Sequence, residues 1–286
     1  MNEFVSRYGP WALVTGASSG IGSEFADQLA GRGMNLVLVG RRKALLEENA
    51  HGLEQRHGTA IRVLPIDLAT ADAVTQIDEA TGDLKIGLLV NNAGGGLPGA
   101  FLDHDVGSEM QFVQLNSVTP MGLAHVFASR MAPHGKGGII FVASTMGYVG
   151  TPYAANYAAT KAYIIALGEA LHYELARQGI DVLVVSPGPT RTSAVDALHN
   201  VDFDRVPLNW MEPEEVVAMG LHALGKQSSV IPGEVNTLVS FLVQHVLPRD
   251  LATSFLGSLL ERMIDHSEQP PRKGGEESDT GGGMGR

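Results

Sequence analysis

Short apolar runs alternate with helical patterns through most of the first 190 residues, and this alternation limits the choice of fold. Each run is almost continuously apolar, which is typical of strands covered on both faces of a parallel sheet. Several runs end in glycine or a small polar residue. The predicted strands are residues 11–16, 35–40, 61–67, 86–94, 138–144 and 180–188.

The segments between these runs read as helices. They cover about residues 21–32, 44–55, 109–131 and 154–177, and the first carries Phe25, Ala26, Leu29 and Ala30 on one face. Strands and helices alternating at this spacing predict right-handed βαβ units. We therefore expect an α/β fold: a single doubly wound parallel-sheet (Rossmann) domain with helices on both faces.

Composition narrows the class of protein further. The chain has 286 residues, a formal charge of −11 and no cysteine. Without cysteine there is no disulfide framework or thiol nucleophile, which suits a cytoplasmic protein. The acidic balance argues against nucleic acid as a partner. The histidines at positions 125, 172, 199 and 222 show no ligand spacing with carboxylates, so we predict no metal. We expect no signal peptide and no membrane-spanning segment.

The domain is expected to cover residues 1–266. Residues 267–286 contain much Gly, Pro and charge and predict a disordered tail. Residues 235–265 have apolar residues at helical spacing. Burial against the domain or a partner subunit is one reading of this segment; a surface that contacts a membrane or lipid is the other.

A glycine-rich loop, "TGASSGIG" at residues 15–22, joins the first predicted strand to the first helix. Glycines allow a tight turn and a close approach of backbone to a ligand, and the helix start offers free N–H groups to a phosphate. A plain glycine turn is the alternative. The strand–loop–helix–strand context favours a dinucleotide site.

The residues at the end of the second predicted strand indicate which dinucleotide the site would bind. An acidic residue there would hold the ribose hydroxyls of NAD, but the chain has Arg41 and Arg42 after Gly40. Arginine can bind a 2′-phosphate bidentately. We therefore expect NADP(H) to be preferred over NAD(H), although both arginines could simply be solvated residues at a helix start.

Five motifs together resemble the short-chain dehydrogenase/reductase family. They are "TGASSGIG", "NNAG" at residues 91–94, Ser144, "YAATK" at residues 157–161 and "SPGPT" at residues 186–190, in the family's order and rough spacing. The resemblance covers about residues 11–192. It implies an oxidoreductase with catalytic Asn116, Ser144, Tyr157 and Lys161.

Tyr157 and Lys161 lie one turn apart on one face of a predicted helix. A free tyrosine has a pKa of about 10, and a nearby ammonium favours the phenolate. Lowering this pKa to about 7 needs about 4 kcal/mol, which we expect Lys161 and a cationic nicotinamide to supply. Tyr157 would then exchange a proton with the substrate oxygen. The resemblance adds that Lys161 binds the nicotinamide ribose.

Ser144 and Asn116 complete the predicted catalytic set. Ser144 follows a strand and could hydrogen-bond the substrate oxygen, or simply satisfy backbone groups. Asn116 lies in a predicted helix, where asparagine is unfavourable, and Pro120 agrees with a local break. In the family the matching asparagine holds a water linked to the lysine. A helix cap is the alternative for Asn116.

The resemblance also assigns cofactor contacts. Pro187, Gly188, Thr190 and Thr192 would lie beside the nicotinamide or phosphates, and Asp67 and Leu68 beside the adenine. The full predicted cofactor set is Gly16, Ser18, Ser19, Gly20, Ile21, Gly22, Arg41, Arg42, Asp67, Leu68, Asn92, Ala93, Gly94, Tyr157, Lys161, Pro187, Gly188, Thr190 and Thr192.

The expected substrate is a hydrophobic ketone or 3-oxoacyl compound, because the predicted lining is mostly apolar. This lining comprises Gly95, Gly96, Leu97, Met146, Tyr148, Tyr153 and a lid at about residues 191–210. The chain would interconvert the carbonyl with an alcohol. A non-catalytic NAD(P)-sensing or binding protein of the same fold is the alternative. The family implies a homodimer or homotetramer; membrane contact remains a secondary possibility.

Overall fold

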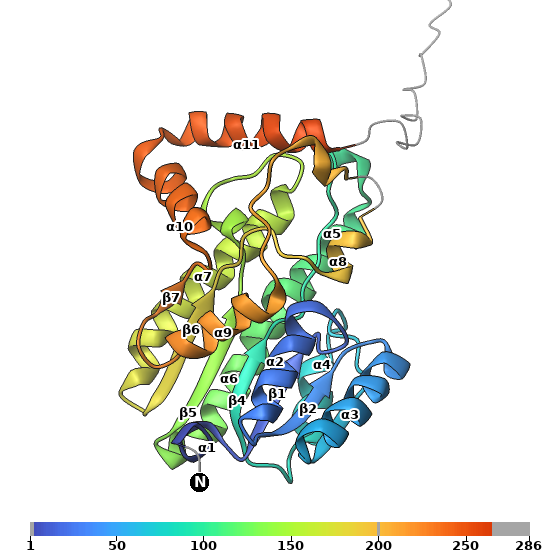
Figure 1. The fold of residues 1–286 in the computed structure, drawn as a ribbon, viewed down its shortest axis with the longest axis vertical. Coiled ribbons are helices and arrows are strands. Elements are labelled where there is room, and N and C mark those ends of the chain that lie inside the picture. Colours follow the sequence, from blue (N-terminus) through green and yellow to red (C-terminus); the bar gives the residue numbers. More distant parts are fainter. Residues whose placement is uncertain (1–2, 199–200, 265–286) are drawn as a thin grey trace, which may run out of the picture.

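The computed structural model describes residues 3–198 and 201–264 and is built around a seven-stranded sheet (Figure 1). All neighbouring strands are parallel, in the order β3-β2-β1-β4-β5-β6-β7. The strand order reverses between β1 and β4, which is where open α/β sheets bind their ligands. The strands are β1 (Trp11–Thr15), β2 (Asn35–Val39), β3 (Ile61–Leu64), β4 (Ile86–Asn91), β5 (Gly137–Val142), β6 (Ile180–Val185) and β7 (Ser229–Val230).

The sheet confirms the predicted doubly wound α/β class. All six predicted strands are present, and the predictions ran past their carboxyl ends by one to three residues. Asp67 and Ser144 therefore follow their strands instead of ending them. Sequence periodicity did not reveal β7, because a strand of two residues shows no periodicity.

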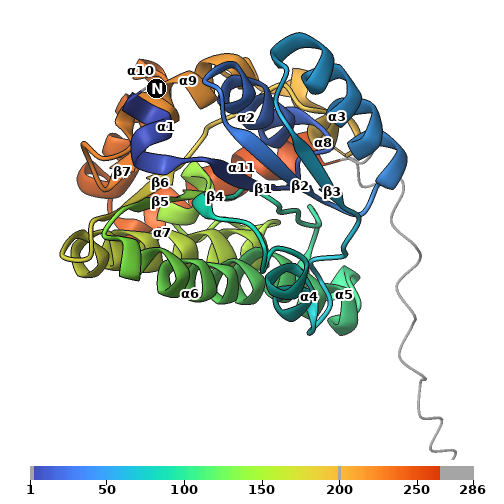
Figure 2. The ribbon, with the colours of Figure 1, turned by 90° about the horizontal axis from the view of Figure 1, so that it is seen from below.

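Helices cover both faces of the sheet (Figure 2). On one face lie α2, α3 and α9; on the other lie α4, α5, α6 and α7. The predicted helix over residues 109–131 is two helices, because residues 114–118 form a π-helical turn. The bounds are α1 (Glu3–Tyr8), α2 (Gly20–Gly31), α3 (Lys43–His57), α4 (Ala73–Ala80), α5 (Val106–Val113), α6 (Thr119–Met131), α7 (Ala155–Ala176), α8 (Ser193–Asp196) and α9 (Pro213–Ala223).

The hydrophobic core has two layers, one on each face of the sheet. Successive residues of a strand point to opposite faces, so Leu36 and Leu38 of β2 enter one layer and Val37 and Val39 the other. These side chains are fully buried. Burial on both faces explains why the strands are continuously apolar in the sequence.

Beyond the carboxyl ends of the strands, α10 (Glu234–Phe241) and α11 (Arg249–Met263) lie above the sheet in Figure 1. This segment buries Asn236, Ala252 and Met263 but exposes a row of apolar side chains. Of the two readings of residues 235–265, burial against the domain therefore holds for one side of the segment. The predicted tail at residues 267–286 lies outside the described residues.

Within residues 3–198 and 201–264, no helix combines the length and apolarity needed to cross a bilayer.

Candidate active site

The glycine loop joins β1 to α2 and lies against the end of β4. Gly16 has a φ of 67°, and its backbone N–H donates to Val39 O of β2. A Cβ at Gly16 would lie 2.8 Å from Asn92 Nδ2 and 2.9 Å from Ala93 Cα. Glycine is therefore required at this turn both for its conformation and for the close approach.

A hydrogen-bond network fixes the glycine loop to the segment after β4. Asn92 Nδ2 donates to Thr15 O at 2.9 Å. Thr15 Oγ1 accepts from the backbone N–H groups of Asn92 and Ala93, each at 3.0 Å. The network holds the two strand ends at the point where the strand order reverses. Thr15 was not singled out from the sequence, because a threonine ending a strand carries no special pattern.

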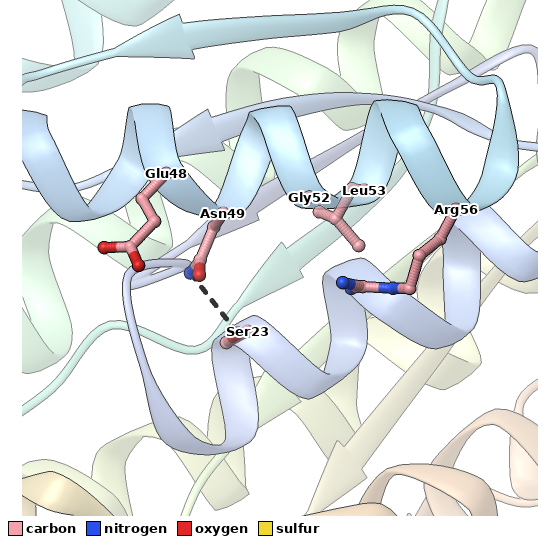
Figure 3. Close-up of a pocket in the computed structure, with 6 residues that line it drawn as sticks. All are labelled: Ser23, Glu48, Asn49, Gly52, Leu53 and Arg56. Carbon is pink, nitrogen blue, oxygen red and sulfur yellow. Dashed lines mark hydrogen bonds between the residues drawn. The ribbon is translucent and has the colours of Figure 1, made fainter.

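The glycine loop is also supported from behind by α3. Asn49 Nδ2 donates to Ala17 O at 3.0 Å and to Ser23 Oγ at 3.3 Å. Figure 3 shows the bond to Ser23 in a pocket of about 240 Å³ between α2 and α3. Sequence reasoning missed Asn49, because its partners are 26 and 32 residues away in the chain.

Arg42 lies over the serines of the glycine loop. Its Nη2 donates to Ser18 Oγ at 2.8 Å and to Ser19 Oγ at 2.7 Å. The guanidinium and two hydroxyls thus form a cluster of donors that an anion could occupy. Arg41 is exposed beside it. Asp67 lies in the turn after β3, where one carboxylate oxygen accepts from Ala69 N at 3.0 Å.

Tyr157 and Lys161 project from the first turns of α7 and are brought together as predicted. Lys161 Nζ lies 5.6 Å from the centroid of the Tyr157 ring and donates to Val142 O at 2.9 Å. Lys161 is only 4% exposed. Ser144 follows β5 and forms a hydrogen bond with Tyr157. Ser144 Oγ also accepts from Met146 N at 3.2 Å, so it satisfies backbone as well.

Asn116 sits in the π-helical turn between α5 and α6, which confirms the expected break in the helix. Its Nδ2 donates to Gly95 O at 2.7 Å and to Thr160 Oγ1 at 3.1 Å, while its Oδ1 accepts from Gly95 N at 3.0 Å. A Cβ at Gly94 would lie 3.1 Å from Lys161 Nζ and 3.2 Å from Asn116 Oδ1. Asn116 and Lys161 therefore both approach Gly94.

Burial controls the ionisation of the two α7 residues. It raises the pKa of Tyr157 above the ordinary value, and the hydrogen bond with Ser144 opposes this shift. It lowers the pKa of Lys161 to about 8. In the protein alone, desolvation of the phenolate therefore keeps the pKa of Tyr157 high, and the lowering expected from Lys161 together with a cationic nicotinamide stays a prediction.

The turn after β6 lies between the glycine loop and the C-terminal helices. Thr190 is buried, and its hydroxyl donates to Gly188 O at 3.0 Å. A Cβ at Gly20 would lie 3.0 Å from the methyl group of Thr192. A Cβ at Gly188 would lie 2.6 Å from the side chain of Asn236. The predicted nicotinamide turn is therefore packed from two sides.

The expected lid, at about residues 191–210, contains α8 and an aromatic pair. Arg191 lies 5.5 Å from the Trp210 ring centroid, and Phe203 packs edge-on against Trp210 at 5.4 Å. These residues line an open pocket of about 300 Å³. Asp202 N donates to Met263 O at 2.7 Å, so the lid is attached to the end of α11.

Residues expected to face the substrate differ in their placement. A Cβ at Gly96 would lie 2.9 Å from the ring of Tyr157, so Gly96 forms one wall beside the tyrosine. Tyr153 donates to Glu261 of α11 at 3.1 Å. Tyr148 is half-buried, and its hydroxyl donates a hydrogen bond to Ser186 Oγ at 3.3 Å. The contact of α11 with Tyr153 was not predicted, because it joins residues that are far apart in the sequence.

No group of three or more metal-ligating side chains is found among the described residues.

Known proteins resemble this chain over most of its length. The family model for short chain dehydrogenase matches residues 10–201. A 7beta-hydroxysteroid dehydrogenase of Clostridium sardiniense is 37% identical over 82% of this chain and 89% of its own. A solved structure from work on 7beta-hydroxysteroid dehydrogenase stereoselectivity superposes with a TM-score of 0.82, at 28% identity, over 90% of this chain and 99% of its own.

A third relative carries a cofactor. It is a short-chain dehydrogenase from Sphingobium yanoikuyae in complex with NADPH. The TM-score is 0.73 and the identity 30%, over 92% of this chain and 99% of that one.

Proposed function

The chain belongs to the short-chain dehydrogenase/reductase family of oxidoreductases, and we propose that it uses NADP(H) to interconvert a hydrophobic ketone with the corresponding alcohol. The observation that carries this proposal is the meeting of Tyr157, Lys161 and Ser144 beside the glycine loop. A 7-position steroid ketone is the first substrate to test, since relatives act on 7beta-hydroxysteroids. A 3-oxoacyl compound is the second.

The residues around the glycine loop fit a dinucleotide. A Cβ at Gly16 would press on Asn92 and Ala93, and one at Gly20 on Thr192, so the loop keeps its tight turn only with glycine. Arg42 with Ser18 and Ser19 offers donors for an anion. We assign Gly16, Ser18–Gly22, Asn92–Gly94 and the turn from Pro187 to Thr192 to this site, with Asp67 and Leu68 on its adenine side. Bound NADPH would supply the hydride.

The chain's own residues would handle the proton. Ser144 holds the substrate oxygen, and Tyr157 donates its proton to that oxygen during reduction. Lys161 stabilises the negative charge that Tyr157 then carries, and it can also bind the ribose. Asn116 fixes Gly95 and, like the lysine, lies close to Gly94. In the oxidation direction Tyr157 accepts the proton instead.

Purified protein with NADPH and a panel of ketones tests the proposal. The panel contains a 7-oxo steroid, bulky aromatic ketones and 3-oxoacyl thioesters, and the loss of reduced nicotinamide is followed by absorbance. Turnover of a hydrophobic ketone is expected. Tight NADPH binding without turnover of any member would instead favour the non-catalytic binding protein, which intact Tyr157 and Lys161 argue against.

Cofactor preference should depend on Arg42. Arg42→Ala is expected to raise the KM for NADPH about 10-fold or more with little effect on NADH, because a charge-assisted, bidentate contact to a phosphate is lost. Steady-state kinetics with both cofactors measure the ratio. Lys85→Ala, a distant exposed cation, is the control. Equal loss with both cofactors would contradict the assignment to the 2′-phosphate.

Self-association is proposed along the helices that carry Asn116 and Tyr157. Met110, Val113, Val118 and Met121 are all exposed along α5, the π-helical turn and α6. Apolar side chains that line one edge in this way are typical of an interface between subunits. A homodimer or homotetramer and a cytoplasmic location complete the proposal.

The double variant Met110→Glu with Val118→Glu is expected to shift the protein to a monomer, because charges replace apolar contacts. Light scattering after size exclusion measures the mass. Leu251→Glu, on the exposed side of α11, is the matched control and should leave the mass unchanged. Dissociation by the control alone would place the interface on α11 instead.

A further inference from the structure

A partly enclosed carboxylate, Glu109, lies behind the start of α7. Its side chain is 13% exposed, and both of its carboxylate oxygens have partners. One oxygen lies 2.9 Å from Nδ1 of His104. The other accepts a short hydrogen bond from Nδ2 of Asn156, which also donates to Glu109 O at 2.9 Å. Glu109 therefore links two segments that are separate in the sequence.

The first link leads directly to Tyr157. Asn156 is the residue before Tyr157, in the first turn of α7. This helix has Ala154 at its N-cap position and no side-chain cap. A helix start without a cap has free backbone donors and frays more readily. The contact between Asn156 and Glu109 supplies an external attachment at the turn that presents the tyrosine.

The second link leads to the loop on the other side of Tyr157. A Cβ at Gly99 would lie 3.1 Å from His104 Nε2, so the imidazole packs against Gly99. Gly99 N in turn donates to Tyr153 O at 2.8 Å. The same loop contains Gly96, which contacts the Tyr157 ring. These contacts connect Asn156 to Tyr153 through Glu109, His104 and Gly99, and the chain itself joins Tyr153 back to Asn156.

We propose that Glu109 is a positioning residue that sets Tyr157 against the substrate-side loop, through Asn156 on one side and His104 on the other. The inference rests on the proposed role of Tyr157. Glu109 touches neither Tyr157 nor Ser144 in the contacts described, and acts through its two partners. Proton transfer depends steeply on geometry, and a displacement of about 1 Å can lower a rate about 100-fold.

The proposal is tested by exchanging the hydrogen-bond donor Asn156 and the acceptor Glu109 with substitutions that keep the side-chain volumes. Asn156→Asp alone puts two carboxylates in contact and is expected to lower kcat about 10-fold or more. Adding Glu109→Gln lets the new amide donate to the new carboxylate and should recover part of that loss, at least about 3-fold, whereas the hydrogen bond to Glu109 O stays lost. The reaction is NADPH oxidation with the fastest ketone of the panel.

The supporting result is a loss in kcat that the second substitution recovers, with the NADPH dissociation constant unchanged within about twofold. Two results would overturn the proposal: a kcat for Asn156→Asp within twofold of wild type, or losses that multiply in the double variant. Glu174→Gln, on an exposed part of α7, is the control for a change of charge.

Tyr157→Phe is assayed in parallel. If Tyr157→Phe retains full turnover, the proposed function fails, and if only the exchange shows no effect, the Glu109 proposal fails alone.

Discussion

Tyr157→Phe is expected to lower kcat for ketone reduction by about 10²–10⁴-fold, the contribution typical of a positioned acid or base. Phenylalanine keeps the ring that packs against Gly96 but removes the hydroxyl that meets Ser144. Only the transfer of the proton is lost, so binding of NADPH should be unchanged. Single-turnover absorbance measures the chemical step, and NADPH fluorescence measures binding.

The pH dependence gives this prediction a second readout. Burial raises the pKa of Tyr157 in the protein alone, so the hydroxyl keeps its proton through neutral pH. Reduction needs that proton and should be fastest at neutral pH, whereas alcohol oxidation needs the phenolate and should become faster as the pH rises into the alkaline range. Tyr173→Phe, on the exposed side of α7, serves as the control. Full turnover by Tyr157→Phe would remove the tyrosine from the mechanism.

Lys161→Met is expected to have two opposite effects: loss of activity and a gain in stability. Removal of a preorganised charge beside the reacting group costs about 10²–10³-fold in kcat. The stability effect follows from the burial of the ammonium, which lowers the pKa of Lys161 to about 8. A shift from about 10.4 in the unfolded chain corresponds to about 3 kcal/mol against the charged form.

The direction in which stability changes with pH depends on how many protons the folded and unfolded states bind. Between about pH 8 and pH 10.4 the unfolded chain binds more protons at this lysine than the folded protein does, so stability rises with pH in that window. Below pH 8 the whole cost is present. Methionine removes this cost but also the hydrogen bond to Val142 O, worth about 1–2 kcal/mol.

Urea unfolding at several pH values measures the difference. At pH 7 we expect Lys161→Met to unfold with a free energy about 1–2 kcal/mol higher than wild type, and the advantage should shrink as the pH passes from 8 to 10.4. Lys85→Met, at an exposed lysine, should show no such trend. A difference that does not vary with pH would show that the ammonium carries no burial cost.

Local patterns were enough to predict much of this protein. Continuous apolar runs, separated by helical segments, predicted six of the seven strands, because burial on both faces leaves a direct trace in composition. Tyr157 and Lys161 could be paired because four residues make one helical turn. The break at Asn116 was also predicted, since asparagine and proline are both unfavourable within a helix.

Contacts between distant residues could not be predicted in this way. Asn49 behind the glycine loop, Glu109 behind Tyr157 and α11 above the substrate wall all depend on the packing of separate elements. Each partner residue has an ordinary local sequence. Nothing in the order of residues near Asn49 indicates that its amide meets Ala17 O, 32 residues away.

The sequence by itself therefore determined the fold class and predicted which groups react, because strand burial, helix spacing and glycine turns are local properties. Only the tertiary structure decided the ionisation of these groups. Lys161 and a cationic nicotinamide were expected to lower the pKa of Tyr157, whereas burial in the protein alone raises the pKa of Tyr157 and lowers that of Lys161. The physical reason is desolvation, which depends on everything that packs around a side chain and not on its neighbours along the chain.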